Sequence, residues 1–152
     1  QTGEKSMYKN ILVPIDTSNK ALVNHVIPHI ESLSKFDDPH IHFLVVIPSY
    51  KMFIGLSYGI EKEIITEDNQ RLKLAEADLK NEVSKFNLPE DRVHYHAILD
   101  TPIDGILTTA EKIHVDLIII SSRSPNISTK YLLGSTASAV VRYAETSVLV
   151  VR

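Results

Sequence analysis

The residues best suited to chemistry lie in the last quarter of the chain, where an apolar run gives way to a polar segment. Residues 117–120 are all aliphatic, residues 121–130 are rich in serine, and Gly134, Ser135 and Thr136 follow. This order predicts a strand, a polar loop and the start of a helix. A helix start presents backbone N–H groups without intrahelical partners at the positive end of the helix dipole. Together with the hydroxyl groups, these donors predict a phosphate site and therefore nucleotide binding.

Other chemistries are less well supported by the residue types. The chain contains no cysteine, which excludes disulfides, thiolate metal sites and cysteine nucleophiles. No Gly-x-Ser-x-Gly sequence surrounds the serines of residues 121–130, so we do not expect a serine hydrolase. Four histidines alternate along two predicted strands: His40, His42, His94 and His96. They would suggest a metal site if those strands were adjacent and in register, but without a carboxylate pattern we expect surface-facing imidazoles.

The composition is typical of one globular domain. The chain has 152 residues, 43% of them hydrophobic and 23% charged, with a net charge of −3, so it is not basic enough to bind nucleic acid non-specifically. It shows no secretory signal and no apolar run of membrane length, so we expect a cytoplasmic protein without a membrane partner. Residues 1–6 precede Met7, the expected native start, and are interpreted as a remnant of protein expression. Residues 7–152 are the expected domain.

Apolar runs and helical periodicity predict an alternation of strands and helices. Strands are expected at residues 10–15, 40–47, 92–99, 115–120 and 147–151, and helices around residues 22–33, 66–86, 102–113 and 135–143. Pro28 lies inside the first helix, which predicts a kink or an early break near Val26. Residues 50–60 are interpreted as a mobile, partly apolar loop. Glu76 and Lys80 are expected on a solvated helix face.

This alternation predicts an α/β fold with a mainly parallel sheet covered by helices on both faces. In open sheets of this kind, a ligand binds at the carboxyl ends of the strands, where the direction of winding reverses, usually near the first and fourth strands. Two polar clusters that are distant in sequence fall there, at residues 14–16 and 121–135. Their convergence on one crevice supports the nucleotide-binding interpretation.

Four segments carry a resemblance to the universal stress protein family. These are residues 7–16, 116–120, 132–135 and 147–152, and further residues at 128–135 and 140–142 are most similar to the short enterobacterial F and G types. The resemblance implies a Rossmann-like, three-layer α/β/α fold. Its open, twisted, five-stranded sheet has the strand order 3-2-1-4-5. In the ATP-binding branch of the family it also implies a loop of the form Gly-x2-Gly-x9-Gly-Ser/Thr.

This chain matches only the end of that loop motif. Gly134 and Ser135 occupy its final glycine and hydroxyl positions, whereas Ser121 and Ser124 stand at the two earlier glycine positions. Glycine permits positive φ and a close approach of phosphate to the backbone, while serine resists that conformation but adds a hydroxyl donor. Arg123 compensates electrostatically, because its guanidinium can form a charge-assisted hydrogen bond with an anionic oxygen.

The resemblance also implies roles for residues on the first, second and fourth strands. Asp16, directly after Pro14 and Ile15, matches an acidic residue near the ribose and the metal-bound phosphates. Its alternative role is to cap the first helix, which would contribute about 1 kcal/mol. Val46 matches a position whose backbone bonds the adenine edge, with Ile15 and Ile120 on either side of the ring. Ordinary core packing is the alternative for Val46, Ile15 and Ile120.

The expected function is regulatory binding of ATP, or of ADP or AMP, together with Mg²⁺, with Gly134, Ser135 and Thr136 holding the outer phosphates. No general base is identifiable, so we expect at most slow ATP hydrolysis or autophosphorylation on a loop serine. Residues 147–151 form an apolar edge strand, and such an edge tends to pair, so a homodimer through this strand is expected. The alternatives are a nucleotide-free protein-interaction module and an enzyme acting on a phosphorylated small molecule.

Overall fold

Five strands alternate with four helices in the described part of the chain. The computed structural model describes residues 7–17, 19–49, 61–122 and 133–152. The strands are β1 (Asn10–Pro14), β2 (His40–Ile47), β3 (Val93–Leu99), β4 (Leu117–Ser121) and β5 (Ser147–Val151). The helices are α1 (Lys20–Asp37), α2 (Glu61–Val83), α3 (Pro102–Lys112) and α4 (Ser135–Tyr143), with a 3₁₀ turn, η2 (Glu90–Arg92), before β3.

The strands form one sheet in the order β3-β2-β1-β4-β5, and every neighbouring pair is parallel. This confirms the predicted fold class and strand order. The winding reverses between β1 and β4, because the chain first builds outward through β2 and β3 and then crosses to the other side of β1. The carboxyl ends of β1 and β4 are therefore the expected place for a ligand crevice.

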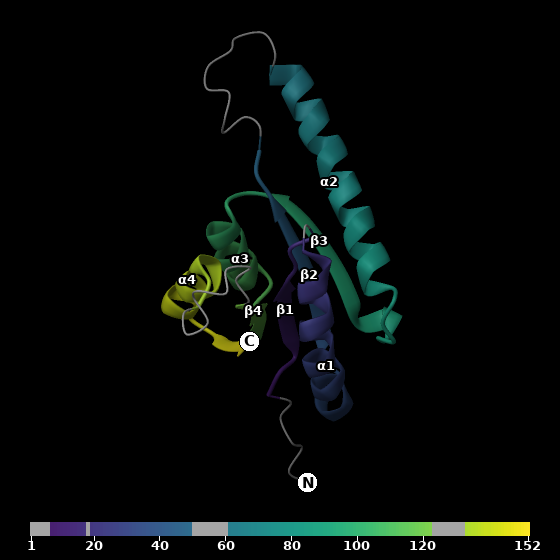
Figure 1. Cartoon of the computed structure of the whole chain (residues 1–152), viewed down its shortest axis with the longest axis vertical. Helices are drawn as coiled ribbons and strands as arrows, with labels where there is room; N and C mark the ends of the chain where they lie inside the picture. Colours follow the sequence, from purple (N-terminus) through teal and green to yellow (C-terminus); the bar gives the residue numbers. More distant parts are fainter. Residues whose placement is uncertain (1–6, 18, 50–60, 123–132) are drawn as a thin grey trace.

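Helices cover both faces of the sheet, in three layers (Figure 1). One face packs against α1 and α2 through a core that includes Ile11, Phe43 and Leu79, while α3 and α4 cover the other face around Leu12 and Ile118. The central strands are buried on both faces, which explains why they read as continuous apolar runs rather than as an alternation.

Two helices differ from their predicted form. Helix α1 runs unbroken from Lys20 to Asp37 with Pro28 inside it, so the predicted early break near Val26 is wrong. Val26, Ile27 and Ile30 are at most 2% exposed, and packing of this buried face holds the helix together despite the hydrogen bond that proline cannot donate.

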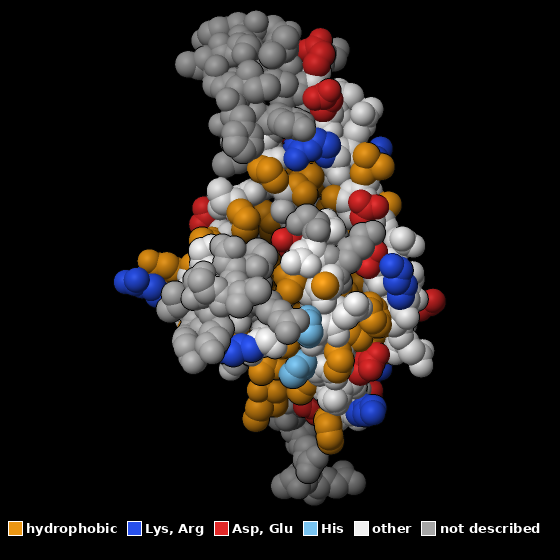
Figure 2. Space-filling view, in the orientation of Figure 1, with side chains coloured by type: hydrophobic (Ala, Val, Ile, Leu, Met, Phe, Trp, Pro, Cys, Tyr) orange, Lys and Arg blue, Asp and Glu red, His pale blue; other side chains and the backbone are white. Residues whose placement is uncertain are grey.

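Helix α2 spans Glu61–Val83 rather than residues 66–86. No capping sequence marks its start, and such signals are what locate a helix boundary in a sequence. Acidic and basic side chains are interspersed along α2 at the right of Figure 2. Glu76 and Lys80 form an ion pair of 3.2 Å, as expected for a solvated face. Among the described residues, no helix is both long and apolar enough to cross a membrane. The predicted loop at residues 50–60 lies outside the described residues.

Candidate functional site

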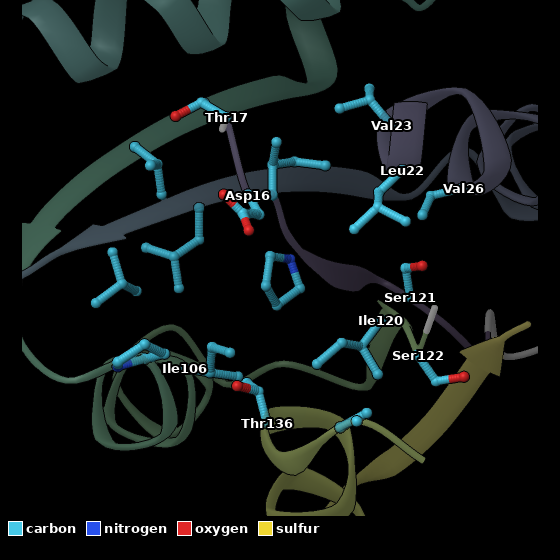
Figure 3. A pocket seen from close by; sticks show the side chains of 18 of the residues that line it. Asp16, Thr17, Leu22, Val23, Val26, Ile106, Ile120, Ser121, Ser122 and Thr136 are labelled. Carbon is cyan, nitrogen blue, oxygen red and sulfur yellow. The ribbon is translucent and has the colours of Figure 1, made fainter. Parts of the chain in front are cut away.

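A cavity of about 620 Å³ opens at the carboxyl ends of β1, β2 and β4. Its walls come from the turn after β1, the first half of α1, the ends of β2 and β4, and the beginnings of α3 and α4. Figure 3 shows side chains from these elements arranged around a common space, with Asp16 on one side and Thr136 and Ile120 on another. The cavity is where the reversal of winding in the sheet predicts a ligand.

Nearly all of the predicted site residues line this cavity. Those in its wall are Pro14, Ile15, Asp16, Val46, Ile120, Ser121, Gly134, Ser135 and Thr136. The other two, Arg123 and Ser124, lie outside the described residues. The fold therefore brings together residues 14–16, 46, 120–121 and 134–136 around one cavity.

The start of α4 forms one wall of the cavity. Gly134 is the N-cap residue, and no side chain from the described residues caps this end of the helix. The first intrahelical hydrogen bond is donated by the Ser138 N–H to the Gly134 carbonyl oxygen, at 2.9 Å. The N–H groups of residues 135–137 precede that bond in the first turn, so they are placed to donate to an anion at the positive end of the helix dipole.

The absence of a side chain at Gly134 is not required by the protein itself. Its φ is −58° and its ψ is 157°, a conformation that any residue adopts. A Cβ atom built there would lie 3.7 Å from the Ser122 carbonyl oxygen, which is ordinary van der Waals contact. Gly134 borders the cavity, and no steric contact within the described part of the chain requires glycine at this position. Open space at this position suits close approach of a ligand.

Asp16 carries the single charged side chain among the described residues that line the cavity. The alternative prediction, that Asp16 caps the first helix, is wrong, because α1 begins at Lys20 with Asn19 as its N-cap. Asp16 instead belongs to the preceding turn, where its carbonyl oxygen accepts a 3.1 Å hydrogen bond from the Asn19 N–H. This turn leaves the carboxylate at the cavity, facing a region that otherwise favours anions.

Part of the cavity wall is aliphatic. Ile15 and Ile120 are 7% and 5% exposed, and Val46 is half-buried at the end of β2. Helix α3 packs tightly against Val46. A Cβ atom at Gly105 would lie only 2.8 Å from Val46 Cγ1 and 3.2 Å from Ile98 Cδ1. Gly105 thus lets α3 approach β2 closely. The cavity combines an apolar slot with a polar end, an arrangement common in ligand sites.

Eleven further residues that line the cavity were not predicted from the sequence. These are Thr17, Leu22, Val23, Val26, Leu44, Val45, Ile47, Pro102, Ile106, Ser122 and Ala137. Most are aliphatic residues whose periodicity marks a core face, and no local pattern separates a residue that lines a cavity from one that fills a core. Ser122 follows directly from the polar loop and could have been found by including the whole run after β4.

The four histidines lie together on β2 and β3, which are adjacent and in register, with His42 opposite His94. His40 is exposed and the other three are half-buried, so these imidazoles are partly surface-facing. They occupy the amino-terminal halves of their strands and are separate from the cavity.

Comparison with known proteins agrees with the fold. A family model described as the universal stress protein family matches residues 7–152. Universal stress protein G of Escherichia coli O157:H7 is 36% identical over 146 residues, covering 96% of this chain and 100% of that protein. The structure of MJ0577 from Methanocaldococcus jannaschii superposes with a TM-score of 0.73 at 26% identity, covering 95% of this chain and 96% of that one.

Two further solved structures carry adenine nucleotides. A universal stress protein in complex with cAMP has a TM-score of 0.58 at 18% identity, covering 95% of this chain and 97% of that one. The universal stress protein of Archaeoglobus fulgidus in complex with dAMP has a TM-score of 0.56 at 18% identity, covering 96% of this chain and 99% of that one. At this identity the likeness concerns the fold. The full-length family match and the relative that shares more than a third of its residues show that this chain belongs to the universal stress protein family.

Proposed function

We propose that this protein binds an adenine nucleotide, ATP or alternatively ADP or AMP, in the cavity at the carboxyl ends of β1 and β4, and that binding serves a regulatory role. The observation that carries the proposal is the convergence of three sequence-distant segments, residues 14–16, 120–122 and 134–136, on one cavity that includes the start of α4. Structural relatives in complex with cAMP and dAMP support the choice of an adenine nucleotide.

The base and the phosphates of the nucleotide would bind to different parts of the cavity wall. The adenine ring would lie between Ile15 and Ile120, with its edge at the backbone of Val46. The outer phosphates would accept hydrogen bonds from N–H groups at residues 134–136 and from the Ser135 and Thr136 hydroxyls. Ser121, Ser124 and Arg123 would complete the phosphate contacts from the loop after β4. An aliphatic slot for the base and backbone donors for the phosphates match the two halves of the ligand.

Asp16 fits a role beside the ribose or a bound cation. A lone carboxylate repels phosphate unless a hydroxyl or a metal ion lies between them. Mg²⁺ prefers oxygen ligands and is commonly held by one or two carboxylates, phosphate oxygens and water. Asp16 can supply the single protein ligand for such an ion, whose charge would neutralise the phosphates. We therefore include Mg²⁺ in the proposal.

The proposed role is regulatory because the described cavity lining offers no general base. Asp16 is its single titratable side chain, and it is placed for ribose or metal contact. At most, slow ATP hydrolysis or transfer of a phosphoryl group to a loop serine is expected. Incubation with ATP should then add the mass of a phosphoryl group to a fraction of the chains. The Ser121→Ala or Ser135→Ala variant should abolish that mass shift, and its persistence in both would contradict modification at these serines.

Nucleotide binding can be tested by calorimetry on nucleotide-stripped protein. ATP, ADP and AMP are titrated with Mg²⁺ into the unmodified chain and into a Gly134→Asp variant, which brings a carboxylate to the proposed phosphate position. Micromolar binding is expected for the unmodified chain, and the variant should lose it through charge repulsion. Ser138→Asp is the matched control, because it adds the same charge to an exposed position one turn further along α4. It should retain most of the affinity.

Absence of binding at millimolar nucleotide would contradict the proposal and favour the nucleotide-free interaction module. Equal losses in the Gly134→Asp and Ser138→Asp variants would mean that overall charge, rather than the start of α4, governs affinity.

We further propose a cytoplasmic homodimer that forms through β5. This strand lies at the end of the sheet and pairs with β4. Exposed apolar side chains flank it on α4, where Val141 is 46% and Tyr143 is 61% exposed. Antiparallel pairing of two β5 strands would satisfy their outer backbone groups and cover apolar surface.

A further inference from the structure

The four histidines of β2 and β3 form a continuous stack on one face of the sheet. Their ring centroids are 5.1 Å apart from His40 to His94, 4.6 Å from His94 to His42, and 5.2 Å from His42 to His96. Side chains on a strand alternate between faces, so His40 and His42 share the face of Leu44 and Val46, which α3 covers further along the strands. The stack occupies the part of this face nearest the strand starts.

Ring nitrogens face one another at two places in the stack. His40 Nδ1 lies 2.8 Å from His94 Nε2, and His42 Nδ1 lies 2.9 Å from His96 Nε2. The second pair is distinguished by Asn10 on β1, whose Oδ1 lies 3.3 Å from His42 Nε2. Because an amide oxygen only accepts, this contact requires the proton of His42 on Nε2 and leaves the Nδ1 lone pair directed at His96.

The surroundings favour neutral rings in the inner pair. Burial, followed by the charges of His94, His96 and His40, lowers the pKa of His42 from 6.5 to about 4. Burial and His94 also lower the pKa of His96, with Glu76 opposing and Lys112 reinforcing the effect. Neutral imidazole is the form that binds metal ions, so the inner pair does not have to release a net proton before it binds one.

We propose that His42 Nδ1 and His96 Nε2 chelate one divalent transition-metal ion of the copper(II) or nickel(II) class, with Asn10 orienting His42. Two imidazole nitrogens that are each about 2.0–2.1 Å from an ion lie about 2.9 Å apart at a right angle, and about 3.4 Å apart at a tetrahedral angle. The two nitrogens, 2.9 Å apart in their hydrogen bond, therefore need to separate by at most about 0.5 Å to bind one ion at either angle. Copper(II) and nickel(II) are preferred because copper(II) binds nitrogen sites most tightly among the divalent first-row metals, and nickel(II) binds them more tightly than the metals before it in the series.

Metal binding requires a change of tautomer and a rotation of the rings, because the Nδ1 lone pair that faces His96 Nε2 must turn toward the ion. In the metal-free pair His96 donates its Nε2 proton to His42 Nδ1, and on chelation that proton moves to His96 Nδ1, so no net proton is released. Across residues 7–17, 19–49, 61–122 and 133–152, no three side chains of metal-binding type converge on one ion position. Water would accordingly complete the coordination. The Asn10 contact is the kind of outer hydrogen bond that fixes the orientation of a metal-binding histidine.

The proposal can be tested by titrating copper(II) into chain that carries no affinity tag, followed by electron paramagnetic resonance. One ion should bind per chain, with a spectrum that shows coupling to two imidazole nitrogens. His42→Gln and His96→Gln should each weaken binding by more than tenfold and remove that coupling. Asn10→Ala should weaken it by about tenfold, and Asn10→Asp, which keeps the oxygen acceptor, should restore it. Circular dichroism verifies that each variant is folded.

His29→Gln is the matched control, because His29 lies exposed on α1, away from the stack. It should bind copper(II) as the unmodified chain does. Binding that survives both His42→Gln and His96→Gln, or that is lost only in His40→Gln and His94→Gln, would overturn the assignment to the inner pair, as would a spectrum without nitrogen coupling. Nucleotide affinity should not change in any of these variants, so this test is independent of the proposed function.

Discussion

At the level of single residues, two glycines have opposite reasons to lack a side chain. Gly105 packs against Val46, and a Cβ atom at this position would clash with it, at 2.8 Å from Val46 Cγ1 and 2.9 Å from Val46 Cγ2. Gly134 has ordinary space around its Cβ position, with the nearest atom at 3.7 Å, and borders the cavity. The first glycine serves the packing of α3 on β2, while the second leaves room for a ligand.

Substitution of Gly105 should therefore impair folding and the site together. Gly105→Ala forces α3 away from β2 or displaces Val46, and overpacking of this kind typically costs about 1–3 kcal/mol. Urea unfolding should show that loss, and calorimetry should show weaker nucleotide binding because Val46 lines the cavity. Gly134→Ala is the control, with the free energy of unfolding nearly unchanged. Equal stability of the Gly105→Ala variant and the unmodified chain would refute the packing role.

At the level of elements, the starts of α3 and α4 differ in how they are capped. Thr101 Oγ1 accepts a hydrogen bond from the Asp104 N–H at 3.4 Å, and Pro102 and Asp104 occupy the first turn of α3. These residues satisfy the helix end from within the chain. Helix α4 begins at Gly134 without such a side chain and with no acidic residue in its first turn. Both helices begin at the cavity, and of the two, α4 is the one whose first N–H groups no described side chain caps.

This difference predicts that Gly134→Asp separates stability from binding. An aspartate at the N-cap can accept a hydrogen bond from the first turn and interacts favourably with the helix dipole, so the variant should gain about 0.3–1 kcal/mol in the free energy of unfolding. Urea denaturation of nucleotide-free protein measures that gain. A variant that is at least as stable as the unmodified chain, but does not bind nucleotide, would attribute the loss to the site alone. Marked destabilisation would contradict the capping argument.

At the level of the whole molecule, β5 determines which surface is available for pairing. The Ser122 N–H donates to the Val151 carbonyl oxygen at 2.9 Å, so the backbone of Val151 faces β4. Backbone groups alternate in direction along a strand, and those of Val148 and Val150 therefore point to the free side of the sheet. These outward groups are the ones that a second copy of the chain would engage.

Removing one outward donor should dissociate the proposed dimer. Val148→Pro eliminates the N–H at that position while leaving the bonds between β4 and β5, because proline is tolerated on the free side of an edge strand. Light scattering coupled to gel filtration should find a dimer for the unmodified chain and a monomer for this variant. Val148→Ala, which shortens the side chain but keeps the N–H, should remain dimeric. A dimeric Val148→Pro variant would exclude pairing through this edge.

The sequence by itself determined the fold class and the segments that form the polar part of the cavity wall. Strands that are buried on both faces must be apolar throughout, so continuous apolar runs in the sequence predict β1, β2 and β4. The change from apolar to polar residues before Gly134 predicts the start of α4. These features depend on neighbours in the chain. The resemblance to a known family added the strand order and the positions of Ile15, Val46 and Ile120, which local pattern alone does not distinguish from ordinary core.

Only the tertiary structure decided which distant residues meet. Helix α1 continues through Pro28 because its buried face packs against the sheet. A turn at Asp16 precedes the helix, so the N-cap is Asn19 and not Asp16. The register of β2 against β3 assembled the histidine stack, and the approach of α1 and α3 added their aliphatic side chains to the cavity. The physical reason is that these outcomes depend on contacts between segments far apart in sequence, whereas periodicity and capping signals report only a residue's own turn or strand.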